Sequence, residues 1–184
     1  MSDRRVHFDR TPPGIRADAI ETFDRDGLEQ GVVLLIKAGR QLLESAPVEF
    51  GELLMDGVLY DATIQAAGRR AEFERKRLGW NYHNPPTEPV AMIPATIFTT
   101  IAYEHPYHDG NKRTAFLTSM LTARALGFMW WEPLDPWEDL LEDVRAFVEG
   151  NESEDPRRKA GSAPENMAKW MLGKIFTVPP QQRE

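Results

Sequence analysis

The strongest constraint on the fold is the repeated helical spacing of apolar residues, with hardly any of the alternation that is typical of β-strands. In the first such segment, five apolar residues mark one helix face: Leu28, Val32, Leu35, Ile36 and Leu43. Asp26 and Glu29 have the spacing of a capping box, which predicts where this helix begins. Pro47 predicts that the helix has ended before it. A chain patterned in this way is expected to fold as an all-α domain.

Further helical segments follow along the chain. A region from Pro47 through the basic stretch RRAEFERKR is expected to be helical, as one helix or two because Gly51 and Gly57 interrupt it. IPATIFTTIAYEH predicts a helix with a proline tolerated near its start. The next helix is predicted from Asn111 to Gly127, and its apolar character on most faces indicates a central, enclosed position.

Two more helices are predicted in the C-terminal third, after FMWWEP, which suits a short extended connection. Asp135 as N-cap and Pro136 open one that Gly150 ends. A polar loop, NESEDPRRKAG, then leads to a final helix capped by Ser162 and Glu165.

The 184 residues suit a single domain. We expect an irregular arm over residues 1–25, a helical domain over 26–176 and a frayed tail over 177–184. The chain has no cysteine, no apolar run as long as a membrane span, no apolar signal core at its N-terminus, and a net charge of −7. These features predict a cytoplasmic protein with no membrane association and no direct binding to nucleic acid.

The stretch HPYHDGNKRTAF, residues 105–116, places two histidines, one acid and two cations around a Gly-Asn turn. Lys112 and Arg113 fall in the first turn of the predicted helix, at the positive end of its dipole, where a cation is disfavoured by about 0.3–1 kcal/mol. Backbone N–H groups at the same place form a ready site for phosphate. A bound anion would therefore explain why both cations are tolerated.

The residues of this turn suit a chain of phosphates. Gly110 provides the positive φ that turns backbone N–H groups inward, and Asn111 can cap the following helix. Lys112 offers an ammonium group and Arg113 a guanidinium fork for phosphate oxygens. We therefore predict a phosphate-binding loop at residues 110–113.

The flanking residues suit catalysis. Asp109 offers a hard oxygen ligand for Mg²⁺, and His105 has the side chain best suited to taking a proton from an attacking hydroxyl near neutral pH. A solvated surface turn is the simpler alternative, but His105 and Tyr107 on one side and an apolar helix on the other favour a loop anchored on the core. Tyr107 is expected to bury its ring, and His108 to be solvated without a role.

These residues resemble the signature loop of the Fic/Doc family, His-x-Phe-x-(Asp/Glu)-(Gly/Ala)-Asn-(Gly/Lys)-Arg, with Tyr107 where Phe is usual. The resemblance implies an α-helical bundle whose core extends from about residue 93 to residue 127. It implies ATP as co-substrate with Mg²⁺, and modification of a hydroxyl on a target protein. It assigns His105 as base, Asp109 to Mg²⁺, and Asn111 and Arg113 to phosphates.

The residue before the motif arginine separates two branches of that family. Members that transfer an adenylyl group mostly have Gly there, whereas Doc-like toxins have Lys and are thought to transfer the γ-phosphate. Lys112 groups this chain with Doc, and Phe116 stands where adenylyl-transferring members commonly have a second Arg. Both departures favour phosphorylation, with Fic-type adenylylation (AMPylation) as the alternative.

Resemblance to Doc also implies partners. Doc-like toxins pair with a separate antitoxin protein, and the known Doc-type target is translation elongation factor Tu. The inhibitory pattern (Ser/Thr)-x-x-x-Glu-(Gly/Asn) of many Fic proteins has no convincing copy here, because Arg145 stands four places before Glu149.

Two interpretations stay open for the segment after the basic stretch. Trp80, Asn81 and Tyr82, followed by His83, form either a short β flap that holds a target peptide or a structural turn packed by Trp80.

Two rival functions also stay open. The pair His108-Asp109, with His83 and Asp135, suits an HD-type metal phosphohydrolase, although Gly110 and Asn111 argue for a loop rather than the helix that such enzymes use. An inactive protein that binds a nucleotide or a partner is the other alternative.

Overall fold

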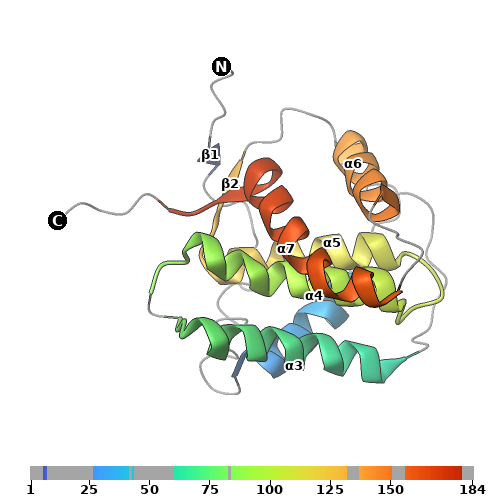
Figure 1. The fold of residues 1–184 in the computed structure, drawn as a ribbon, viewed down its shortest axis with the longest axis horizontal. Helices are drawn as coiled ribbons and strands as arrows, with labels where there is room; N and C mark the ends of the chain where they lie inside the picture. Colours follow the sequence, from blue (N-terminus) through green and yellow to red (C-terminus); the bar gives the residue numbers. More distant parts are fainter. Residues whose placement is uncertain are drawn as a thin grey trace.

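The structure is a computed structural model that describes residues 6–7, 27–41, 43, 60–82, 84–131, 137–150 and 156–179. Helix predominates among these residues, which confirms the predicted all-α class. The elements are an N-terminal helix over residues 27–41, α3 (Asp61–Leu78), the short 3₁₀ helix η1 (Glu88–Ala91), α4 (Met92–Glu104), α5 (Asn111–Ala125), α6 (Trp137–Gly150) and α7 (Pro156–Lys174), as drawn in Figure 1.

Helix α4 lies at the centre of the bundle. It packs against α3, α5 and α7, and residues 93–102 are all buried (Figure 1). Its sequence allows this because apolar and small residues cover every face. The buried hydroxyls of Thr99 and Thr100 donate to carbonyls of the preceding turn, at Ala95 and Thr96, which removes the cost of unpaired polar groups. Helix α5, predicted to be central, shares this enclosed position and packs between α4 and α6.

The N-terminal helix buries the predicted face: Leu28, Val32, Leu35, Ile36 and Leu43 are all buried. Asp26, its predicted cap, lies outside the described residues. The backbone N–H of Leu28 donates to Glu72 of α3 at 3.3 Å.

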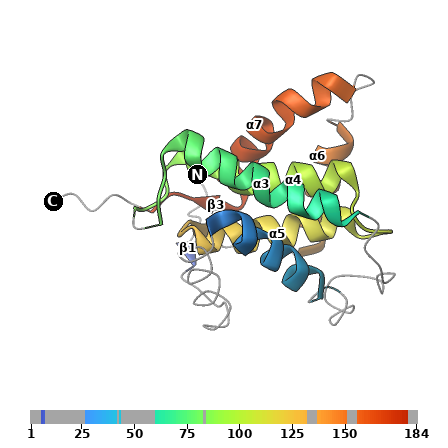
Figure 2. The same cartoon turned by 90° about the horizontal axis from the view of Figure 1, so that it is seen from below.

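The same helix lies very close to α3. A Cβ atom added at Gly68 of α3 would come 2.5 Å from the carbonyl oxygen of Glu29, so only glycine permits this approach. Figure 2 shows the helix running from α3 toward the start of α5. Its last turn is thereby brought to the HPYHDGNKRTAF loop.

Three very short strands form a small antiparallel sheet in the order β1-β2-β3. They are β1 (Val6–His7), β2 (Met129–Trp131) and β3 (Phe176–Thr177). Strand β2 falls in the segment FMWWEP that was expected to be extended. Residues 6–7 belong to the stretch predicted as an arm and residue 177 to the predicted tail, so both ends of the described chain meet at β2.

The predicted start of the last helix was wrong. Helix α7 begins at Pro156, so Ser162 and Glu165 lie within it, and it continues through Pro164. Proline suits the first turn of a helix, and the Arg-Arg-Lys-Ala sequence after Pro156 consists of good helix formers.

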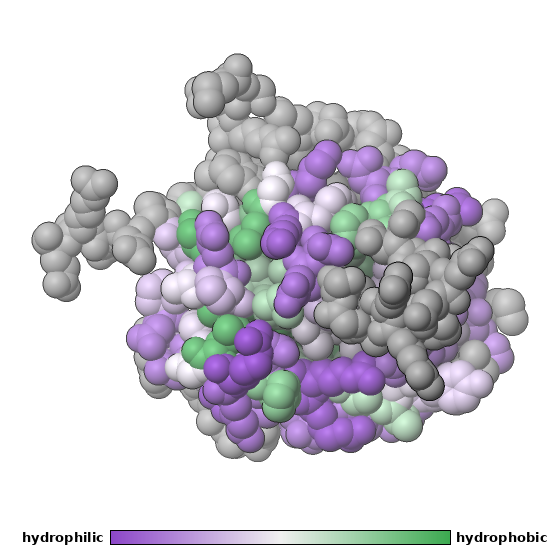
Figure 3. Space-filling view, viewed as in Figure 1, coloured by the Kyte–Doolittle hydropathy of each residue, from purple (hydrophilic) through white to green (hydrophobic). Residues whose placement is uncertain are grey.

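The outer face of α3 is strongly hydrophilic (Figure 3). Four of its five basic residues pair with glutamates. Arg75 and Lys76 pair with Glu72, Arg77 pairs with Glu74, and Arg70 pairs with Glu104 of α4. Among the described helices, none is long and apolar enough to cross a lipid bilayer.

Candidate active site

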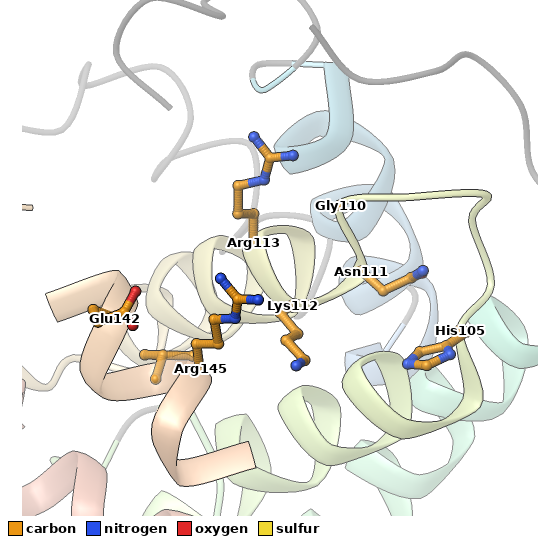
Figure 4. A pocket seen from close by; sticks show the side chains of 8 residues that line it. His105, Gly110, Asn111, Lys112, Arg113, Glu142 and Arg145 are labelled. Atoms are coloured by element: carbon orange, nitrogen blue, oxygen red, sulfur yellow. The ribbon is translucent and has the colours of Figure 1, made fainter. Parts of the chain in front are cut away.

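A pocket of about 610 Å³ opens where α4 ends, α5 begins and α6 passes over both (Figure 4). Eight residues line it: His105, Gly110, Asn111, Lys112, Arg113, Glu142, Val144 and Arg145. The structure thus brings together most of the residues that the motif predicted. Asp109 is not among the lining residues, and three residues of α6 join the site.

The loop between α4 and α5 is bent by two residues in the left-handed region. His105 ends α4 with φ 48° and ψ 64°, and Gly110 precedes α5 with φ 64° and ψ 14°. Glycine adopts this conformation freely, whereas a histidine there is strained by about 1 kcal/mol or more. Such strain at an exposed residue is typical of a functional position, where the backbone aims a side chain rather than minimises its own energy.

Asn111 anchors the loop instead of capping the helix. Its Oδ1 accepts a hydrogen bond from the N–H of Tyr107 at 2.9 Å, and its Nδ2 donates to the carbonyl of Tyr107 at 2.9 Å. Gly110 takes the N-cap position, and Asn111 occupies the first helical position with its side chain nearly buried. The predicted capping role was therefore wrong. The amide of Asn111 is used to fold the loop, so contact between its side chain and a phosphate stays a prediction.

Tyr107 buries its ring as expected, with 2% of the residue exposed. The guanidinium of Arg40, from the N-terminal helix, stacks over that ring at 4.5 Å. Its Nη1 donates to the carbonyl of Asp109 at 2.8 Å, and its Nη2 lies 3.5 Å from the Asp109 carboxylate. This one buried arginine therefore holds the loop at two places.

Sequence reasoning missed Arg40, although a signal was present. Arg40 follows Ile36 by four places and precedes Leu43 by three, so it lies on the buried face of its own helix. A charged residue in an apolar stripe needs a partner inside the protein.

The two adjacent cations of the motif point in different directions (Figure 4). Lys112 extends toward α6, where its Nζ lies 3.1 Å from Glu149 Oε1. Arg113 also lines the pocket, but its side chain leaves α5 in another direction, as that of the next residue in a helix must. Of the two, Lys112 therefore faces the wall formed by α6.

Helix α6 brings a charged group of its own to the pocket. The Nε of Arg145 donates to Glu149 Oε1 at 3.0 Å, the oxygen that Lys112 also contacts. The hydrogen bonds from Arg145 and Lys112 lower the pKa of Glu149, and Glu149 raises the pKa of Arg145. One carboxylate, which is not itself a lining residue, thus links two of the lining cations, and its side chain is half exposed.

Asp109 can supply one carboxylate to a metal ion. Its side chain is 37% exposed, and its Oδ1 lies 3.5 Å from Nη2 of Arg40. No group of three acidic, histidine or cysteine side chains capable of holding a metal occurs in the described part of the chain. This donor set fits Mg²⁺ held mainly by nucleotide phosphates and water, with a single carboxylate from the protein.

The predicted flap residues form a turn, not a strand. Trp80 is buried and meets the ring of Tyr82 edge-on at 5.2 Å. Arg75 donates to the carbonyl of Trp80 at 3.2 Å and lies over Tyr82 at 5.9 Å. These contacts favour the structural turn over a β flap. A role of Trp80, Asn81 and Tyr82 in target binding stays a prediction, and His83 lies outside the described residues.

Residues 33–122 match the protein-family model described as Fic/DOC family. The match includes the end of the N-terminal helix, α3, α4, the loop and most of α5, so this segment is similar to the Fic/Doc family. No curated protein and no solved structure matches the chain. Members of this family are protein-modifying transferases that use a nucleotide and act on hydroxyl side chains, and the matched segment contains the loop and the first turn of α5.

Proposed function

We propose that this protein transfers the γ-phosphate of ATP to a Ser or Thr hydroxyl of a target protein. The observation that carries the proposal is the direction of Lys112. Its side chain lines the pocket and extends toward α6, and a glycine at this position would bring no such group. A Lys at this place supplies a point charge for a terminal phosphate and fills space that an adenylyl-transferring site keeps empty.

Phe116 supports the same choice. Adenylyl-transferring relatives commonly have a second arginine at this place in the motif. Here the phenylalanine is 2% exposed and packs in the core, so it offers no charge to the pocket. The phosphate ligands that remain in the motif are the first turn of α5 with Lys112 and Arg113.

The reaction follows from the placement of His105. The target hydroxyl oxygen forms a bond to the γ-phosphorus, the bond from that phosphorus to the bridging oxygen breaks, and ADP leaves. His105 takes the hydroxyl proton as the new bond forms. Mg²⁺, held by Asp109 together with the phosphates, would neutralise charge on the phosphate oxygens.

The biological setting that we propose is a Doc-like toxin controlled by a separate antitoxin and blocking translation, with elongation factor Tu as the first target to test. This rests on the branch residue Lys112 and on the motif. The position of His108-Asp109 in a loop weighs against an HD-type phosphohydrolase.

The test compares two labels. The protein is incubated with a cell extract, Mg²⁺ and ATP labelled at either the γ or the α phosphate, and labelled proteins are separated by size. We expect γ label on a protein band and no α label. Label transfer from the α position alone would assign the chain to the adenylyl transferases, and the H105A variant controls for other kinases in the extract.

A further inference from the structure

The α6 wall of the pocket lies outside the family segment, which ends at residue 122. It contributes Glu142, Val144 and Arg145 to the lining. Figure 4 shows the guanidinium of Arg145 directed toward the first turn of α5, facing Lys112. Neither the motif nor the family match assigns a role to this residue.

Two cations that face each other across a pocket repel unless an anion lies between them. In the structure, the Oε1 atom of Glu149 fills that place, contacting Arg145 at 3.0 Å and Lys112 at 3.1 Å. The geometry shows that both cations can bind a single anionic oxygen at once. A phosphate group offers three such oxygens and more charge, so it can meet the same two donors.

The ion pairs with Glu149 are open to solvent. The side chains of Arg145 and Glu149 are 64% and 50% exposed, and that of Lys112 is 33% exposed. Pairs of this kind are screened by salt and are easily exchanged for another anion. The carboxylate of Glu149 is therefore replaceable by a ligand.

We propose that Arg145 binds the phosphates of the nucleotide from the α6 side, opposite the N-terminus of α5. This inference rests on the proposed function, because it takes the pocket to hold ATP. Arg145 supplies a guanidinium to a site in which Phe116 stands in place of the second motif arginine. A guanidinium fork matches the geometry of phosphate oxygens better than an ammonium group does, so lysine is an imperfect substitute.

The experiment measures binding of Mg²⁺–ATP and of inorganic tripolyphosphate to the full chain by isothermal titration calorimetry. R145A is compared with the parent protein and with R69A, which removes an exposed arginine from α3 and makes the same change in net charge. We expect R145A to lower the affinity for both ligands by about fivefold to twentyfold, as loss of one charge-assisted contact does. The affinity of R69A should stay near that of the parent, and the affinity of R145K should lie between those of R145A and the parent.

The outcomes separate the two proposals. A parent protein that binds neither ligand removes ATP as the co-substrate and with it the proposed function. If the parent binds both ligands and R145A binds them as tightly as R69A does, the role of Arg145 is overturned while the proposed function stands. Because Arg145 is exposed, an unchanged circular dichroism melting curve is expected for R145A, and it verifies that weaker binding is not a folding defect.

Discussion

On the α5 side of the pocket the polar groups make buried contacts, whereas on the α6 side Arg145 and Glu149 meet in exposed ion pairs. Arg40, Tyr107 and Asn111 fix the loop before α5 through hydrogen bonds and ring stacking that solvent hardly reaches. Arg145 and Glu149 meet on the surface, where salt and ligands compete for them. The α5 wall is therefore pre-organised for the reaction, whereas the side chains of the α6 wall can adjust to a ligand.

The same difference in exposure to solvent separates two glutamate–arginine ion pairs. Glu72 pairs with Arg75 where their side chains are 13% and 22% exposed, and it also accepts from the backbone of Leu28. Glu149 pairs with Arg145 in the open. Each glutamate has a lowered pKa because of a hydrogen bond from its arginine, yet we expect only the first to contribute much to stability.

The largest expected effect comes from the pre-organised wall. Replacing His105 with Ala removes the proton acceptor, and γ-phosphate transfer should fall by about 10²–10⁴-fold while ATP binding is retained. Transfer rates with labelled ATP and calorimetric binding measure the two properties separately. Unchanged transfer by H105A would remove His105 as the base.

The same position also tests the backbone strain. H105G should be inactive but more stable than H105A by about 1 kcal/mol, because glycine accepts the left-handed conformation that alanine resists. Chemical denaturation of the two variants measures this difference. Equal stabilities would show that the strain inferred at His105 is not there.

Arg40 gives the next largest effect. R40A should lower the free energy of unfolding by about 1.5–3 kcal/mol, since it removes a buried charged donor from the partly buried Asp109 carbonyl. R40K keeps the charge but not the fork or the stacking on Tyr107, so its loss should be smaller. Urea denaturation checks both, with R69A expected within about 0.5 kcal/mol of the parent. A loss for R40A no greater than for R69A would contradict the anchoring role.

The pH dependence of stability tests the partly buried ion pair between Glu72 and Arg75. The folded pKa of Glu72 lies below the ordinary value of 4.5, so its contribution is fully present above pH 4.5 and is lost as the pH falls through the lower folded pKa. E72Q should therefore be less stable than the parent by about 1 kcal/mol near pH 7. This difference should shrink in acid. Denaturation at a series of pH values measures it, and a difference that is constant with pH would assign the effect to packing.

The smallest effect is expected at Glu149. E149Q frees Arg145 and Lys112 from a competing carboxylate, so ATP should bind about twofold to fivefold more tightly at low salt, and the gain should fade at high salt. Calorimetry at two ionic strengths provides the measurement. Weaker binding by E149Q would mean that Glu149 orients the cations instead of competing with the ligand.

Much of the fold could be predicted because its signals are local. Apolar spacing and proline or glycine limits defined the N-terminal helix, α4 and α5 without knowledge of their neighbours. His105, Gly110 and Lys112 lie close together in the sequence, so this part of the pocket could be predicted from one short stretch. Pro156 misled the prediction because a polar segment after a helix suits a loop as well as the first turn of the next helix.

The parts that could not be predicted depend on contacts between residues that are far apart in the sequence. Arg40 meets Asp109 across 69 positions, and Lys112 meets Glu149 across 37. Glu72 contacts the start of a helix 44 positions earlier. No periodicity encodes such meetings, because they depend on how helices pack after they form. The α6 wall could not be found for that reason, although Arg145 and Glu149 were both visible in the sequence.

The small sheet has a practical consequence for engineering. Strands β1 and β3 flank β2 on its two edges, so residues 6–7 and 176–177 lie about two strand spacings apart, roughly 10 Å. A short peptide could join the ends of the described chain, and the circularly permuted gene could open the polypeptide at a surface turn away from the pocket. New termini placed there would carry a fluorophore or an affinity handle without disturbing the sheet.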